Sequence, residues 1–111
     1  MATRKGTADF ILEHLGLPGR FSVRPMFGEF AVYADGKVVG LICDDQLFVK
    51  IMPESGALAD RCEPGSPFPS AKPYYRVPEE LIAGDGSFPG LLLRMAVMLP
   101  FPKAKGAKKR R

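Results

Sequence analysis

Residues 23–50, VRPMFGEFAVYADGKVVGLICDDQLFVK, constrain the fold more than any other part of the chain. Apolar and polar residues alternate along this stretch between turn-forming residues, a pattern typical of antiparallel strands joined by hairpins. Asp35-Gly36 is the strongest hairpin signal, because a type I′ turn needs positive φ at both central residues. Asp44-Asp45 marks the next turn. The pattern predicts four strands in one antiparallel sheet, at residues 21–25, 29–34, 37–43 and 46–51.

The segment before this sheet, TADFILEHLG at residues 7–16, predicts a helix. Its apolar residues recur at helical spacing. Thr7 is the expected N-cap, and Asp9 suits the first turn. Gly16 and Pro18 end the helix, because neither favours its continuation.

The segments after the sheet predict a mixture of elements. We expect a weak helix over about residues 54–62, a loop over the Pro-rich residues 63–73 and a short strand at 74–77. A helix begins at Pro78, because proline suits the first helical position. An apolar helix, with most of its surface covered, follows at residues 87–99.

The order of these elements indicates an α+β domain. We expect a two-layer structure in which an antiparallel sheet of about five strands carries helices on one face. The folded domain spans residues 1–102, and residues 103–111 form a basic tail that we expect to be flexible.

The length and composition fit one globular domain whose core needs neither disulfides nor a metal. No apolar run is long enough to span a bilayer, and the N-terminus lacks the apolar core of a signal peptide. We therefore expect a cytoplasmic protein. Cys43 and Cys62 have no metal-binding spacing, so reduced thiols are the favoured interpretation and a redox pair is the alternative.

The net charge of +4 arises from the C-terminus. Six of the sixteen basic residues lie in the last nine positions, which leaves ten basic against twelve acidic residues elsewhere. Such a tail can bind phosphate polymers weakly and without sequence specificity. The candidate nucleic-acid contacts are Lys103, Lys105, Lys108, Lys109, Arg110 and Arg111.

The residues that catalysis would require do not form a recognisable set. His14 is the one histidine, so no His-based triad with a second base of that type can be assembled. The acidic pairs at residues 44–45 and 79–80 are explained by a turn and by a helix N-terminus. No phosphate-binding glycine motif is present. We expect a protein that is not an enzyme and has no cofactor and no metal.

Several short motifs follow one another along the chain in a distinctive order. They are Arg24, Met26-Phe27-Gly28, Tyr33, Asp35-Gly36, Leu47-Phe48-Val49-Lys50, Tyr74-Tyr75 and Pro78-Glu79-Glu80-Leu81. Their order resembles the TfoX N-terminal domain family, which comprises the N-terminal domain of the bacterial competence regulator TfoX and its single-domain relatives. The resemblance covers roughly residues 8–98 and implies a two-layer α+β fold, a dimer and a role in competence or transcription regulation. It implies no catalytic residues.

The physical interpretation of Met26-Phe27-Gly28 is a corner of the sheet. Gly28 permits a bend or bulge between two strands, and Met26 and Phe27 offer adaptable apolar surface beside the helices. The candidate interaction surface comprises Arg24, Met26, Phe27, Gly28, Asp35, Gly36, Tyr74, Tyr75 and Arg76.

Three hypotheses follow from the sequence. The first is a non-enzymatic regulatory domain that acts through protein–protein contacts as a homodimer, with an edge or a face of the sheet available for pairing. The second is a nucleic-acid-associated regulator whose tail supplies the affinity. The third is a small-ligand binder that uses Arg24, Tyr74, Tyr75 and Arg76 to stack on a planar or anionic ligand.

Overall fold

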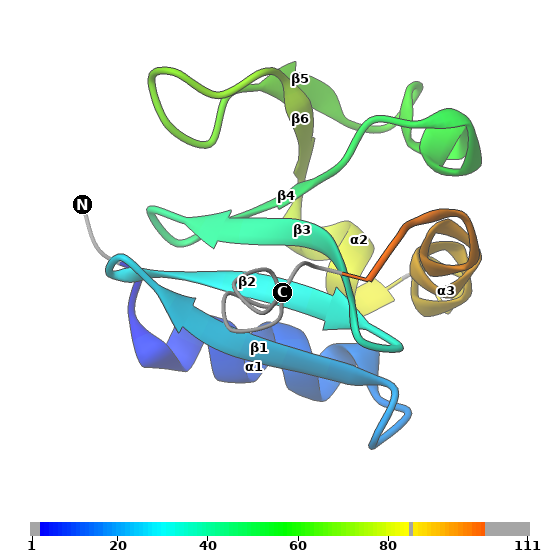
Figure 1. Cartoon of the computed structure of the whole chain (residues 1–111), viewed down its shortest axis with the longest axis horizontal. Helices are drawn as coiled ribbons and strands as arrows, with labels where there is room; N and C mark the ends of the chain where they lie inside the picture. Colours follow the sequence, from blue (N-terminus) through cyan, green and yellow to red (C-terminus); the bar gives the residue numbers. More distant parts are fainter. Residues whose placement is uncertain (1–2, 85, 102–111) are drawn as a thin grey trace, which may run out of the picture.

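The chain folds into one antiparallel sheet with helices on one side of it (Figure 1). The computed structural model describes residues 3–84 and 86–101, so the basic residues of the 103–111 tail lie outside the described part. Its elements are, in chain order, α1 (Lys5–Leu15), β1 (Phe21–Met26), β2 (Glu29–Ala34), β3 (Lys37–Cys43), β4 (Gln46–Val49), the 3₁₀ helix η1 (Pro53–Leu58), β5 (Glu63–Gly65), β6 (Tyr74–Val77), α2 (Glu79–Gly84) and α3 (Phe88–Met98).

The sheet has six strands in the order β1-β2-β3-β4-β6-β5, and every neighbouring pair is antiparallel. The predicted α+β class is confirmed. The additional strand is β5, which lies in the Pro-rich segment predicted as a loop. Pro64 lacks an N–H group, and β5 tolerates it because this strand is at the edge of the sheet and pairs only with β6.

Three two-residue turns connect the first four strands. Asp35-Gly36 has positive φ at both residues, as predicted, and so does Asp44-Asp45. The third turn is Phe27-Gly28, with φ of 52° and 83°. The prediction that Gly28 allows one strand to turn into the next is confirmed, whereas the placement of Phe27 beside the helices was wrong, because Phe27 is 98% exposed at the tip of a hairpin.

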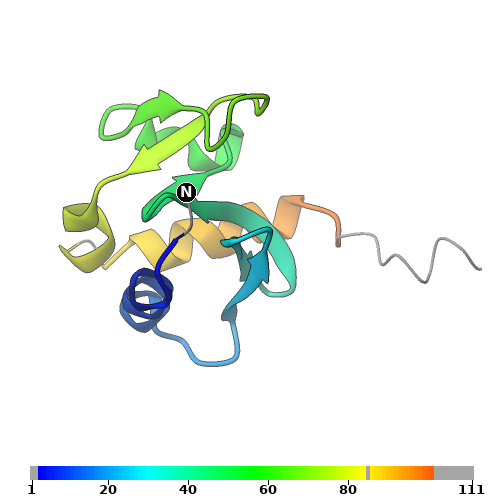
Figure 2. The same ribbon diagram turned by 90° about the vertical axis from the view of Figure 1, so that its left-hand side faces the viewer.

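All four helical elements pack on the same face of the sheet. Figure 2 shows α1 on one side of the strands, and buried residues of α1, α2, α3 and η1 share the main core there, whereas the hydrophobic cluster on the opposite side contains strand residues alone. We refer to that opposite side as the helix-free face. The main core lies on the helical side and combines strand residues with residues of every helical element, for example Val32, Ile42, Leu47, Ile11, Leu15, Leu58, Leu81, Phe88 and Met95.

The start of α1 is fixed by a residue from a distant turn. The helix begins at Lys5, and its N-cap is Arg4 rather than the predicted Thr7. The carboxylate of Asp45 accepts hydrogen bonds from the Arg4 backbone N–H, at 2.9 Å, and from the Thr7 hydroxyl, at 2.7 Å. Thr7 therefore joins the helix to the β3–β4 turn.

The predicted weak helix is shorter than expected and has 3₁₀ geometry. The side chain of Ser55 is fully buried, and its hydroxyl lies 2.7 Å from the carbonyl oxygen of Lys50, to which it donates. The backbone N–H of Met52 donates to the same hydroxyl. These bonds hold the connection that leads from β4 to the helical side.

The C-terminal end of α3 is less covered than predicted. Val97 is 74% exposed and Met98 61% exposed, and Phe101 beyond the helix is 68% exposed. The ammonium group of Lys37 donates to the carbonyl oxygen of Ala96 and lies 4.8 Å from the centre of the Phe101 ring. This end of α3 is thus held against the β2–β3 turn while its apolar side chains face outward.

Substitution of Gly40 tests how closely β3 and β4 approach. A Cβ at this position would lie 2.3 Å from the carbonyl oxygen of Phe48, which belongs to the backbone of β4. We expect Gly40→Ala to lower the free energy of unfolding by at least about 2 kcal/mol, measured by urea denaturation. The control Gly6→Ala meets no atom within 4 Å and should change it by less than about 1 kcal/mol. Equal stability of the two variants would contradict the close approach.

Substitution of Asp45 tests the anchor of α1. Hydrogen bonds from the Arg4 backbone N–H and then from the Thr7 hydroxyl lower the pKa of Asp45. A lowered pKa means that the carboxylate stabilises the folded state above its unfolded pKa of about 4, and that this contribution is lost as the pH falls through the folded pKa. Asp45→Ala should therefore lower the urea midpoint at pH 7, and its deficit should shrink progressively below about pH 4.

Asp44→Ala is the matched control, because Asp44 has positive φ as well. Both variants carry the same backbone strain, so their difference isolates the carboxylate of Asp45. A deficit that is the same for both, or that does not change with pH, would show that Asp45 does not hold the helix.

Candidate functional site

The register of the sheet places five residues in a row across the helix-free face. Arg24 of β1 lies opposite Ala31 of β2, which lies opposite Leu41 of β3. Leu41 lies opposite Phe48 of β4, and Phe48 lies opposite Arg76 of β6. We refer to Ala31, Leu41 and Phe48 as the apolar strip. The two flanking arginines are four strand spacings apart, or about 19 Å between their Cα atoms.

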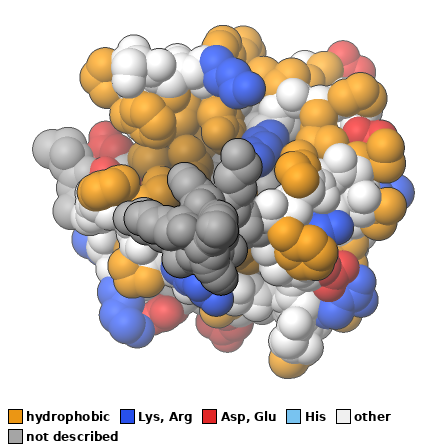
Figure 3. Space-filling view, viewed as in Figure 1, with side chains coloured by type: hydrophobic (Ala, Val, Ile, Leu, Met, Phe, Trp, Pro, Cys, Tyr) orange, Lys and Arg blue, Asp and Glu red, His pale blue; other side chains and the backbone are white. Residues whose placement is uncertain are grey.

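The apolar strip belongs to a second hydrophobic cluster that is separate from the main core. The strip and Cys43 are buried, and the half-buried side chains of Met26, Tyr33 and Tyr74 pack against them. All members of this cluster come from strands. Figure 3 looks onto this side of the molecule and shows hydrophobic side chains gathered there, with Lys or Arg side chains close by. The helix-free face therefore carries a buried apolar cluster that half-buried side chains and cations surround.

Four cations surround the apolar strip, and we refer to Arg24, Lys50, Lys72 and Arg76 as the cationic rim. The guanidinium of Arg24 lies 5.3 Å from the centre of the Tyr33 ring. Lys50 comes two residues after Phe48 and so lies on the same face. Burial, and then repulsion from Lys72, lower the pKa of Lys50. Among the described residues, no acid forms an ion pair with any of the four.

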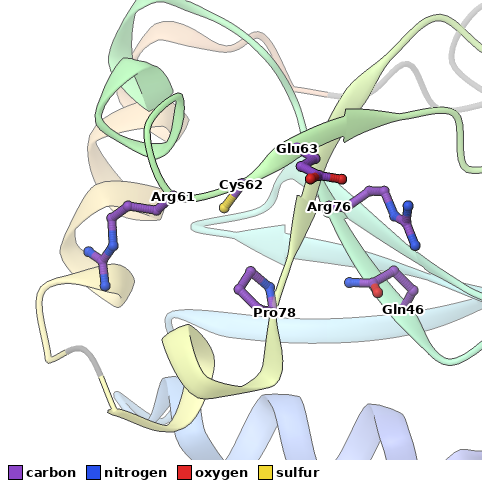
Figure 4. A pocket seen from close by; sticks show the side chains of 6 residues that line it. All are labelled: Gln46, Arg61, Cys62, Glu63, Arg76 and Pro78. Carbon is purple, nitrogen blue, oxygen red and sulfur yellow. The ribbon is translucent and has the colours of Figure 1, made fainter.

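Two hollows adjoin Arg76. One, of about 350 Å³, is open to the helix-free face, and its lining includes Cys43, Phe48 and Gly65. The other, of about 340 Å³, lies at the far end of β6 (Figure 4). Arg61 and Arg76 stand on opposite sides of this second hollow, and their guanidinium groups point away from each other. They do not converge on a single anion, whereas the first hollow connects Arg76 with the apolar strip.

Both cysteine thiols are in surroundings that suppress their reactivity. Cys43 and Cys62 are free and buried. Burial is the largest cause that raises the pKa of each thiol, and Glu29 and Asp44 raise that of Cys43 further. A thiol with a raised pKa is a poor nucleophile at neutral pH. The geometry thus assigns both cysteines to packing.

The other residues with catalytic chemistry are occupied locally. The Nδ1 atom of His14 lies 2.9 Å from the Phe10 carbonyl oxygen in the preceding turn, and its ring packs 4.2 Å from that of Phe10. Glu79 and Glu80 are in the first turn of α2, where they oppose the positive end of the helix. The described residues contain no group of three or more His, Cys, Asp or Glu side chains placed to bind a metal. Within this same part of the chain, no helix is long and apolar enough to cross a membrane.

The structure brings together four of the nine residues predicted as an interaction surface. Arg24, Met26, Tyr74 and Arg76 share the helix-free face. Tyr75 is buried in the main core, because alternation turns it to the helical side. A small-ligand site that combines Tyr74 with Tyr75 is therefore wrong.

The other four predicted residues form hairpin tips. Phe27 and Gly28 turn between β1 and β2. Asp35 and Gly36 turn between β2 and β3, and the guanidinium of Arg20 donates to Asp35 with one bond of 2.8 Å. This bond is the largest cause that lowers the pKa of the Asp35 carboxyl. The turn residues thus have structural roles, away from the row across the face.

Sequence analysis missed part of the site. Lys50 and Lys72 were not connected with Arg24, because they are far apart in the sequence and only the strand order brings them to one face. Tyr33 and Phe48 were noted as parts of motifs without an assigned face. The available signal was the two-residue alternation along each strand, which separates the faces once the register is known.

Comparisons with known proteins agree with the sequence resemblance. The family model described as the TfoX N-terminal domain matches residues 12–91. The chain is also 37% identical over 108 residues to an uncharacterized 12.7 kDa protein in the trpE 5′ region of Spirochaeta aurantia. This alignment covers 97% of the chain and 93% of the relative. The relative is thus similar in extent as well as in sequence.

Proposed function

The chain belongs to the TfoX N-terminal domain family, and we propose that it is a non-enzymatic regulatory domain that acts through protein–protein contacts as a homodimer. TfoX is a bacterial competence regulator, so the process that we propose is regulation of transcription or of DNA uptake. The proposal concerns how such a small domain makes its contacts.

The observation that carries the proposal is the exposed apolar end of α3. Val97, Met98 and Phe101 are three large apolar side chains within five residues, and each is more than half exposed. Clustered exposed apolar residues of this kind favour protein–protein contact. Local interactions already occupy His14, and burial suppresses both thiols, which supports a role in binding rather than in catalysis.

Two other surfaces are poor places for a second copy to bind. Each edge strand contains a proline, Pro25 in β1 and Pro64 in β5, and proline removes a hydrogen-bond donor from the edge. The helix-free face would bring the cationic rims of two copies together, and like charges repel. The end of α3 is neither a sheet edge interrupted by proline nor part of the cationic rim. We therefore assign the homodimer contact to it.

We expect the intact protein to have twice the 12.1 kDa mass of one chain when light scattering is measured at micromolar concentration. The double variant Val97→Lys/Met98→Lys should be a folded monomer, because both side chains are exposed and contribute little to the core. Its thermal midpoint should be independent of protein concentration, whereas that of the dimer should rise with concentration. The control Leu17→Lys/Phe68→Lys adds the same charge at other exposed apolar positions and should remain a dimer.

The same variants test the regulatory role in the host. Deletion of the gene should alter transcript levels, and the control should restore them while the monomeric variant should not, at matched protein levels. A wild-type protein that is monomeric up to about 100 μM would refute the homodimer. Unchanged transcripts after deletion would refute the regulatory role independently.

A second candidate is a nucleic-acid-associated regulator, favoured by the six basic residues in the last nine positions. A full-length variant in which all six become Gln keeps the chain length and removes the charge. If the tail supplies the affinity, this variant should lose binding to a random 20-base-pair duplex in fluorescence anisotropy at low salt. The wild type should bind, and its affinity should fall steeply as salt is raised. Equal affinity of the two proteins would exclude the tail as the anchor.

A further inference from the structure

We propose that the helix-free face is a binding site for single-stranded nucleic acid, with phosphates on the cationic rim and bases against Tyr33 and Tyr74. This inference goes beyond the homodimer, which uses the end of α3, and it assigns a site in the folded domain rather than in the tail.

Positive charge predominates on the helix-free face. The cationic rim contributes four positive charges, and Glu63, which lies opposite Arg76 across β5 and β6, contributes a negative charge without forming an ion pair among the described residues. On the helical side, the acids Asp9, Glu13, Glu79 and Glu80 of α1 and α2 outnumber the cations Lys5 of α1 and Arg94 of α3. A polyanion is therefore attracted more strongly to the cationic rim than to these helices.

Lys50 and Lys72 are the two lysines of the cationic rim. Lys50 is half-buried, and the positive charge of Lys72 lowers its pKa in addition to burial. Lys72 is exposed and comes two residues before Tyr74, so it adds a second positive charge near this edge of the helix-free face. Tyr74 lies beside them, because Val49 pairs with Tyr75 across the two strands.

The aromatic side chains favour a single strand over a duplex. Tyr33 and Tyr74 are half-buried on the helix-free face, and each retains exposed surface. Arg24 already stacks on Tyr33, so its planar guanidinium extends the surface on which a base could lie. The Tyr74 hydroxyl is a hydrogen-bond donor at neutral pH. Bases in a duplex stack on each other and cannot reach such a platform, whereas bases of a single strand can.

The dimensions of the face suit a short stretch of nucleotides. The row from Arg24 to Arg76 spans about 19 Å across five strands, and the apolar strip lies between these two cations. Single-strand binding sites on small β-domains accept from about 4 to 16 nucleotides. Phe101, the last described residue, lies beside Gly36 and Lys37 of the β2–β3 hairpin.

The test is fluorescence anisotropy with labelled dT15, rU15 and a 15-base-pair duplex at about 50 and about 200 mM salt, with full-length proteins throughout. In Arg24→Ala/Arg76→Ala we expect at least about tenfold weaker binding to the single strands, and a salt slope that is smaller by about 1.4. In Tyr33→Leu/Tyr74→Leu we expect about fivefold or greater weakening for single strands and little change for the duplex. The dT15 and rU15 arms distinguish a DNA site from an RNA site.

The matched control is Lys5→Ala/Arg94→Ala, which removes two exposed cations from the helical side and should change affinity by less than twofold. Circular dichroism melts show whether each variant is folded. The arginine and the tyrosine double variants remove different groups, so if one of them misfolds, the other still tests the site. The same comparison is made in the background of the Gln-substituted tail. There too, Arg24→Ala/Arg76→Ala should bind the single strands more weakly than the protein with both arginines.

Three results would overturn the proposal. In the first, Arg24→Ala/Arg76→Ala and Tyr33→Leu/Tyr74→Leu both bind with wild-type affinity, and the Gln-substituted tail variant does not bind. This result would assign all binding to the tail. Another is a duplex bound as tightly as dT15 with no effect of the tyrosines. The third is no binding of any probe at 100 μM protein, which would leave the cationic rim for an acidic protein segment. Light scattering on the same samples reports the homodimer separately, so the two proposals can fail independently.

Discussion

The pleat of the sheet is the constraint on which the rest of this structure depends. Successive side chains of a strand point to opposite faces, so once helices cover one face, every second residue of each strand is assigned to the other. Val32, Ile42 and Leu47 become core in this way, while Ala31, Leu41 and Phe48 become the apolar strip. The candidate site thus follows from the same alternation that builds the core.

The three tight turns align the alternation of neighbouring strands, so that residues of the same face lie opposite each other. A two-residue hairpin fixes the register of its strands, and a shift by one residue would exchange the faces. Positive φ at Phe27-Gly28, Asp35-Gly36 and Asp44-Asp45 keeps the register of β1 to β4. The last of these turns also supplies Asp45 to the start of α1, so one short loop sets both the strand register and the position of a helix.

The surfaces of the domain differ in what they can bind. Its two edges carry prolines, and α1 and α2 carry acids on the helical side. The helix-free face has cations that form no ion pair among the described residues, and the end of α3 has exposed apolar side chains beside Lys37. This division supports two separate proposals, one for a second copy of the chain and one for a polyanion.

The sequence by itself determined the α+β class, the meander, the Asp-Gly turn and the family, because alternation and turn chemistry are local properties. It could not locate β5, since Pro64 is compatible with a strand only at an edge, and edges are defined by tertiary pairing. It assigned Thr7 as the cap of α1, because the true acceptor, Asp45, is distant in the chain. Only the strand order placed Lys50 and Lys72 with Arg24 and Arg76, and separated Tyr74 from Tyr75 in role. The tertiary structure decided the site, because a face of a sheet is built from residues that only hydrogen-bonded pairing brings together.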